Sequence, residues 1–190
     1  AAQAVYDWLI QHPNIDKDRL VIFGISFGSF FGAQAAAQLG DKVKGAALSF
    51  VCHEPGCYTI FNMAAPTFKL RFMFMANYDD EAEFDEFASE FSLDPIVDQI
   101  KCPILVQGGQ DEELSPVECS EDFVNKLSVP KKLVFYEGER HAIGGGSAAY
   151  LGENWYTMLA DWCLDRVNDK PAPNESVLIN SLGQAEATPY

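Results

Sequence analysis

One short stretch, LVIFGISFGSFFGAQAAAQ at residues 20–38, joins an apolar run to an alanine-rich segment through a serine placed between glycines. The apolar run contains β-branched side chains, which is typical of a strand buried on both faces of a sheet. Residues 27–39 have the composition of a helix, and Gly40 is a typical helix end. A strand that passes so directly into a helix predicts an α/β fold with a parallel sheet.

The turn itself, Gly24-Ile25-Ser26-Phe27-Gly28, has the form G-x-S-x-G. In this pattern the serine takes a strained backbone conformation, so that its hydroxyl stands clear of the sheet, and the glycines let strand and helix pass closely. The serine then lies at a helix N-terminus, where backbone N–H groups favour negative charge. We therefore expect Ser26 to be a nucleophile and the N–H of Phe27 to point at a developing oxyanion.

Apolar runs and amphipathic segments alternate along the rest of the chain. We expect helices at residues 2–11, 117–127 and 150–167, and further strands in VKGAALSFV, CPILVQGG and KKLVFYE. Strands that alternate with helices predict a doubly wound, mostly parallel sheet covered on both faces and joined by right-handed crossovers.

Residues 52–98 interrupt this alternation inside a predicted core of residues 1–168. They are too long for a simple connection and are rich in phenylalanine and tyrosine. We expect a helical, aromatic-rich insert, with a helix starting near Asp80, that lies over the sheet as a small lid and lines a pocket. Residues 169–190 lose periodicity and are expected to form a tail or an extended strap.

A formal net charge of −15 makes the surface strongly acidic. Such a surface repels nucleic acid and anionic membranes, so neither is an expected partner. No apolar run is long enough to span a bilayer, and no signal peptide is visible. These features favour a cytoplasmic protein.

The chain has five cysteines, an odd number, with no Cys-x-x-Cys pair. This usage predicts free thiols in a reducing compartment. Cys52, His53, Glu54 and Cys57 lie close together in the sequence, but no second cluster completes four ligands. We therefore expect no metal, and the chemistry described next requires no organic cofactor.

A serine hydroxyl needs a base, and the chain has three histidines. His12 lies in a polar loop before the motif, and His53 follows the next predicted strand as a candidate pocket residue. His141, in EGERHAIGGG, follows the predicted KKLVFYE strand and precedes the final predicted helix, so its loop can fold back over the sheet edge. We therefore expect His141 to be the base.

The third member of such a site orients the imidazole and stabilises its cation. The segment LVQGGQDEELSP ends a predicted strand with three adjacent acids. Asp111 is the first acid after the glycines and is the expected partner of His141, with Glu112 as the alternative. Each of Ser26, the acid and His141 then follows a strand of one parallel sheet, and such strand ends meet at one edge.

These three motifs, GISFGS, GGQDEELSP and GERHAIGGG, resemble the α/β-hydrolase superfamily in type and order, and the resemblance covers residues 1–168. Within it the chain is most similar to an esterase-and-lyase-type group that includes polyketide-shortening enzymes and dihydroxypseudooxynicotine hydrolases. That placement implies an ester bond, or a carbon–carbon bond beside a carbonyl, as the bond cleaved.

The superfamily pattern has strands before the serine turn, and an early loop that supplies a second oxyanion N–H. Here the serine is only residue 26. The resemblance therefore implies a C-terminal portion, completed by a missing N-terminal half or by another copy of the chain.

The predicted function is a serine hydrolase that acts on a small apolar or aromatic acyl substrate through an acyl-enzyme. Ile25, His53, Glu54 and Phe72 are candidate pocket residues. Two alternatives stay open: a serine peptidase domain of the prolyl-oligopeptidase type, and a non-catalytic binding domain that keeps the fold. The phenylalanine-rich insert argues against the first, and the presence of all three triad residue types argues against the second.

Overall fold

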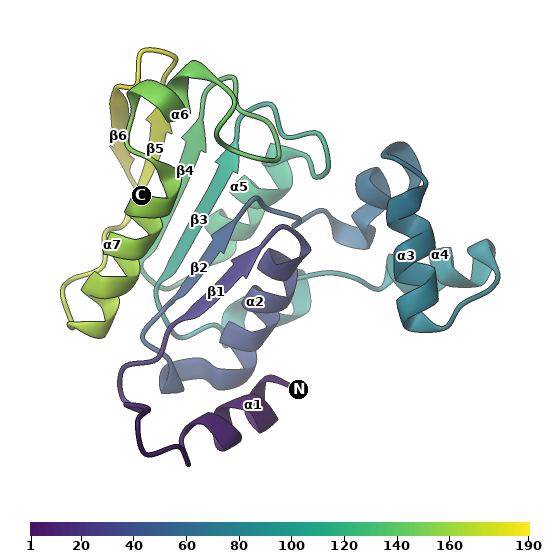
Figure 1. Ribbon diagram of the computed structural model, residues 1–190, viewed down its shortest axis with the longest axis horizontal. Helices are drawn as coiled ribbons and strands as arrows, with labels where there is room; N and C mark the ends of the chain where they lie inside the picture. The colour runs from purple at the N-terminus through teal and green to yellow at the C-terminus, as the bar shows by residue number, and fades with distance from the viewer.

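The computed structural model describes residues 1–190 and contains one six-stranded sheet (Figure 1). The strands lie side by side in chain order: β1 (Ile22–Ile25), β2 (Ala46–Ser49), β3 (Ile104–Gly109), β4 (Lys131–Tyr136), β5 (Glu175–Ile179) and β6 (Ala185–Pro189). β1 to β5 run parallel, and only the β5–β6 pair is antiparallel. The predicted α/β class with a mostly parallel sheet is confirmed.

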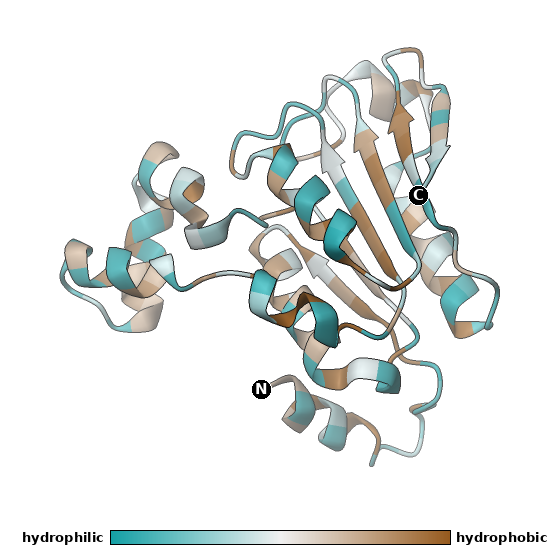
Figure 2. Ribbon diagram, turned by 180° about the vertical axis from the view of Figure 1, so that it is seen from behind, coloured by the Kyte–Doolittle hydropathy of each residue, from teal (hydrophilic) through white to brown (hydrophobic).

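Helices cover both faces of this sheet. They are α1 (Ala2–Leu9), α2 (Phe27–Leu39), the short 3-10 helix η1 (Gly40–Lys42), α5 (Val117–Lys126), α6 (Ser147–Leu151) and α7 (Trp155–Val167). Alternate residues of each central strand enter two separate cores: one packs against α2 and α5, and the other packs against α7. Figure 2 shows the apolar residues gathered along these central strands. None of the helices is long and apolar enough to cross a membrane.

The helix predicted at residues 150–167 is divided in the structure. α6 ends at Leu151, and α7 begins at Trp155 after a break at Gly152. A Cβ atom on Gly152 would lie 2.6 Å from Cγ2 of Ile179, so the β5–β6 hairpin approaches this backbone closely. The amphipathic pattern of the sequence does not show this contact, because the hairpin itself was not predicted.

The insert between β2 and β3 consists of short helices. They are η2 (Pro55–Cys57), the π-helix η3 (Thr59–Met63), α3 (Thr67–Ala76), α4 (Glu81–Ser89) and η4 (Asp94–Gln99). The Asp80 carboxylate caps α4 by accepting hydrogen bonds from the N–H groups of Ala82 and Glu83, as expected for a helix starting there.

The expectation that this insert covers the sheet is wrong. Figure 1 shows α3 and α4 standing to one side of the sheet. Aromatic side chains of the insert pack against Phe27, the first residue of α2. The ring centroids of Phe72 in α3 and Phe61 in η3 lie 4.4 and 6.0 Å from that of Phe27. The insert therefore forms a wall next to the serine turn, held there by aromatic packing.

Residues 169–190, expected to form a tail or an extended strap, contribute two strands to the sheet. β5 pairs with β4 in parallel, and β6 returns beside β5 as the outer strand. Val177 and Ile179 of β5 are 5% and 2% exposed and enter the core that α7 covers. This segment therefore belongs to the fold and completes its sheet on the β4 side.

Candidate active site

Ser26 lies at the turn between β1 and α2, with backbone angles φ 54° and ψ −129°. A positive φ is unusual for serine, and its persistence here marks a turn that the neighbouring structure holds in place. The Ser26 N–H donates to the carbonyl of Ser49 in β2 at 2.9 Å. The strained residue is therefore fixed to the neighbouring strand and presents its side chain at the carboxyl end of the sheet.

The two glycines of the motif are not equivalent. A Cβ atom on Gly24 would lie 2.2 Å from the carbonyl oxygen of Gly28, so this position admits no side chain without moving the backbone. A Cβ atom on Gly28 would meet nothing within 4 Å. The expectation that both glycines serve close packing is therefore correct for Gly24 and wrong for Gly28.

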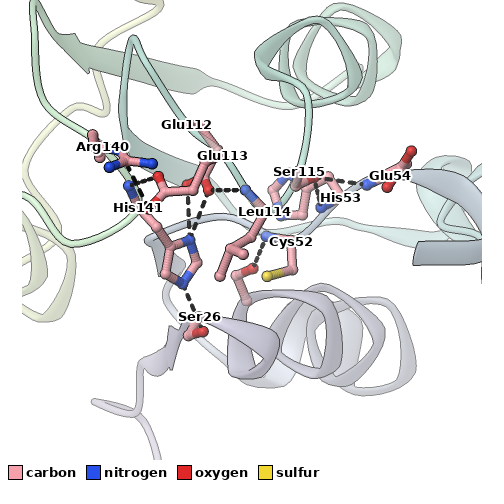
Figure 3. A network of polar contacts seen from close by, with 11 residues as sticks. Ser26, Cys52, His53, Glu54, Glu112, Glu113, Leu114, Ser115, Arg140 and His141 are labelled. Atoms are coloured by element: carbon pink, nitrogen blue, oxygen red, sulfur yellow. Dashed lines mark hydrogen bonds and ion pairs between the residues drawn. The ribbon is translucent and has the colours of Figure 1, made fainter. Parts of the chain in front are cut away.

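His141 lies in the loop that follows β4 and faces Ser26 directly (Figure 3). Its Nε2 is 2.8 Å from the Ser26 hydroxyl oxygen. The structure thus brings together two residues that are 115 positions apart in the sequence. His12 is exposed in its loop and takes no part in this arrangement.

Glu112, and not Asp111, is the acid that contacts His141. Its two carboxylate oxygens lie 2.9 and 2.8 Å from Nδ1 of the imidazole, and its side chain is fully buried. The chain turns immediately after β3, where the N–H of Asp111 donates to the carbonyl of Glu139 at 2.8 Å. That bond leaves the Asp111 side chain exposed and directs the next residue inward.

Glu113, the third acid of this run, holds the backbone of the histidine. Its carboxylate accepts a hydrogen bond from the His141 N–H at 2.8 Å and pairs with Nε of Arg140 at 3.4 Å. Glu112 is itself anchored, because its Oε1 accepts a hydrogen bond from the Leu114 N–H at 2.8 Å. Sequence reasoning missed the role of Glu113, although the run of three acids is visible.

Glu139, which begins the histidine loop, is buried and binds the glycine-rich segment that follows His141. Its carboxylate accepts hydrogen bonds from four backbone N–H groups, those of Gly144, Gly145, Gly146 and Ala149. Burial alone would raise the pKa of Glu139, but these four donors outweigh it and lower the pKa. The carboxylate therefore organises this loop, and sequence reasoning missed this residue too.

A pocket of about 520 Å³ opens beside Ser26 and is walled by Phe27 and the insert. Phe72, a candidate from the sequence, lines it. The other three candidates do not. Ile25 exposes its side chain on β1, and the Glu54 carboxylate accepts hydrogen bonds from the N–H and hydroxyl of Thr59 at the start of η3.

His53 is the remaining candidate, and it lies in a separate, smaller pocket of about 190 Å³. Its ring is 4.9 Å from that of Phe123, and neither ring nitrogen has a hydrogen-bond partner. Burial lowers the pKa of His53 to about 3. Its imidazole is therefore neutral at physiological pH and lies away from Ser26.

Cys52 is buried and lies next to Ser26. Burial, followed by the charge of Glu112, raises the pKa of this thiol to about 12. All five cysteines are free, and no group of three or more His, Cys, Asp or Glu side chains is arranged to hold a metal ion. The Cys52 thiol therefore stays protonated, and the hydroxyl that faces His141 is that of Ser26.

A sequence model described as the prolyl oligopeptidase family matches residues 2–170. No curated protein matches the chain in sequence.

Several solved structures share the fold. A 2,6-dihydroxy-pseudo-oxynicotine hydrolase matches with a TM-score of 0.75 and 19% identity, over 90% of this chain and 47% of that one. Acetyl xylan esterase 1 from Thermoanaerobacterium sp. matches with a TM-score of 0.64 and 14% identity, over 87% of this chain and 51% of that one. A puromycin-hydrolyzing peptidase from Mycobacterium tuberculosis matches with a TM-score of 0.61 and 25% identity, over 74% of this chain and 21% of that one. The chain thus spans about half the length of the first two.

Proposed function

Because the chain belongs to the prolyl oligopeptidase family, we propose that it is a serine hydrolase in which Ser26, His141 and Glu112 form the catalytic triad. The family match and the similar folds also make it a member of the α/β-hydrolase superfamily, as its three motifs predict. The observation that carries the proposal is the continuous line of hydrogen bonds from the serine hydroxyl, through the imidazole, to a buried carboxylate.

In the proposed reaction the Ser26 oxygen attacks an acyl carbonyl carbon while its proton passes to Nε2 of His141. Glu112 accepts the hydrogen bond from Nδ1–H, which selects the tautomer with a free Nε2 and stabilises the imidazolium. The imidazolium then returns the proton to the leaving group as its bond to the carbonyl carbon breaks. Water, activated by the same imidazole, attacks the acyl-enzyme and releases the acid.

The backbone N–H of Phe27 is the proposed donor to the developing oxyanion. It lies in the first turn of α2, where N–H groups have no acceptor within the helix. The helix N-terminus adds a favourable partial positive charge at the same point. Such a preorganised donor binds the oxyanion that develops during attack more strongly than the carbonyl oxygen of the bound substrate. It therefore lowers the activation free energy of the attack.

The substrate is proposed to carry an apolar or aromatic acyl group, because seven of the ten residues that line the pocket beside Ser26 are hydrophobic. An ester bond is the first candidate for cleavage. A peptide bond is the second, because the family is named for an oligopeptidase and a peptidase is among the similar structures. A carbon–carbon bond beside a carbonyl is the third candidate for cleavage.

A fluorophosphonate probe tests the nucleophile, and intact mass measures the result. We expect one probe on the wild-type chain, none on Ser26→Ala and far slower labelling of His141→Ala, whereas His12→Ala labels like the wild type. A folded wild-type chain that takes up no probe would overturn the proposal in favour of a binding domain. Labelling that persists in Ser26→Ala would also overturn it.

The bond is then identified with matched substrates that share one apolar acyl group. These are a p-nitrophenyl ester, a peptidyl p-nitroanilide and a β-diketone, each compared by kcat/KM. We expect the ester to be cleaved with the highest kcat/KM. A higher value for the anilide would assign the chain to peptide hydrolysis instead.

A further inference from the structure

The pocket beside Ser26 is mostly apolar, and its polar lining residues are Ser26, Thr67 and Arg71. Its lining contains a single charged side chain, Arg71 of α3, and no carboxylate. Arg71 is exposed, so water hydrates its guanidinium in the free protein, and a ligand that displaces this water must offer the charge another partner. No hydrogen bond or ion pair joins Arg71 to another group of the protein, in contrast to Lys69 on the same helix.

Lys69, two residues earlier on α3, shows the contrast. It is buried, donates hydrogen bonds to Asn62 and Asp85, and pairs with Glu81 at 3.3 Å. Residues two apart on a helix face in different directions, so Lys69 ties α3 to α4 while Arg71 lies on the pocket. The same helix therefore carries one cation used for structure and one that is free.

Few cationic side chains of this protein lack a hydrogen-bond or ion-pair partner. Of thirteen lysine and arginine side chains, eleven make a hydrogen bond or ion pair with a protein atom, and only Lys17 and Arg71 make none. The chain has an excess of acids, with a net charge of −15. An arginine left unpaired in so acidic a protein, and lining the pocket beside Ser26, is available to a ligand.

We propose that Arg71 is a specificity-determining residue that binds an anionic group of the substrate, and that this group is a carboxylate. The proposal rests on the hydrolase function above and names its substrate class: acyl compounds with a carboxylate separated from the scissile carbonyl by an apolar chain or ring. The planar guanidinium matches a carboxylate with two parallel hydrogen bonds. A singly charged group is favoured over a doubly charged phosphate, because the net negative charge of the protein repels the latter more strongly.

Matched esters test this directly. The mono-p-nitrophenyl esters of adipic and suberic acid carry a free carboxylate, and their methyl esters are neutral compounds of nearly equal length. The measured quantity is the ratio of kcat/KM for the acid over that for its methyl ester. In the wild-type enzyme we expect the acid to be preferred, and Arg71→Gln to lower the ratio roughly tenfold through the acid alone.

Two further variants separate recognition from general electrostatics. Arg71→Lys keeps the charge but loses the bidentate geometry, so it retains only part of the preference. Lys17→Gln removes the other unpaired cation, which lies in the loop between α1 and β1 and does not line the pocket, and leaves the ratio unchanged. Added salt lowers the kcat/KM ratio of acid over methyl ester in the wild type, because it screens the attraction between the guanidinium and the carboxylate. The same salt has little effect on this ratio in Arg71→Gln.

The outcomes are distinguishable. A preference that is absent in the wild type, unchanged in Arg71→Gln or lowered equally by Lys17→Gln would overturn the role of Arg71 while neutral esters are still cleaved. A chain that neither cleaves the neutral esters nor takes up the fluorophosphonate would overturn the hydrolase function, and this inference with it.

Discussion

The three adjacent acids after β3 show how one residue position decides a role. Asp111 is exposed, Glu112 binds the imidazole and Glu113 binds the backbone of His141. The sequence shows that an acid follows the strand, but the direction of each side chain depends on the turn. That turn is set by a hydrogen bond from Asp111 to Glu139, 28 residues away, which no local pattern reveals.

His53 provides a test of burial at a single residue. Its pKa is lowered from 6.5 to about 3, so between these values the unfolded chain binds a proton that the folded chain does not. The free energy of unfolding therefore falls as pH falls from 6.5 toward 3. We expect His53→Phe to make this fall shallower, as measured by urea unfolding at several pH values.

The matched control for this measurement is His12→Gln, because His12 is exposed. It should keep the pH dependence of the wild type. An identical pH dependence in His53→Phe and the wild type would show that His53 is not buried as the structure places it.

At the scale of elements, the strand-turn-helix around Ser26 was the most predictable part of the site. An apolar run, a serine between glycines and an alanine-rich segment all specify the same local geometry, and the structure has β1, the turn and α2 at these residues. The histidine loop was predictable in position only. Its shape depends on Glu139 and the four N–H groups it binds, a contact between a side chain and a later backbone segment.

The two motif glycines predict opposite outcomes on substitution. Gly24→Ala places a methyl group against the Gly28 carbonyl, so we expect it to distort the turn, lower stability and abolish fluorophosphonate labelling. Gly28→Ala has open space and should keep both fold and labelling. Thermal unfolding and labelling of the two purified variants decide this, and equal behaviour of the pair would contradict the close approach at Gly24.

At the scale of the whole molecule, the sheet and its layering followed from the sequence, but its last two strands did not. β6 is exposed along its full length, so it shows no alternation of apolar and polar residues, and it ends in proline. The position of the insert was missed for another reason. Its aromatic residues pack around Phe27. The sequence pattern indicates that these residues are buried, but it does not identify the residues that they pack against.

The family assignment extends what the motifs predicted. The α/β-hydrolase resemblance is confirmed, and the prolyl oligopeptidase family, which sequence reasoning kept as the alternative, is the family that matches. The expectation that another segment or a second copy completes the sheet beside β1 stays a prediction.

Ile179 tests whether β5 is part of the fold. It is 2% exposed and packs in the core under α7, so Ile179→Ala should lower the free energy of unfolding by about 2–5 kcal/mol in urea titrations. Thr188→Ala, on exposed β6, should change it by no more than about 0.5 kcal/mol. Equal effects of the two substitutions would return residues 169–190 to the status of a tail.

The most direct test of the account compares Glu112→Gln with Asp111→Asn by the rate at which fluorophosphonate labels Ser26. Each substitution removes one negative charge and nearly preserves shape, and the two residues are adjacent. We expect Asp111→Asn to label at close to the wild-type rate and Glu112→Gln to label about 10²- to 10⁴-fold more slowly, because the amide no longer holds the imidazole in its productive tautomer. The reverse order, or equal rates, would contradict the triad of Ser26, His141 and Glu112.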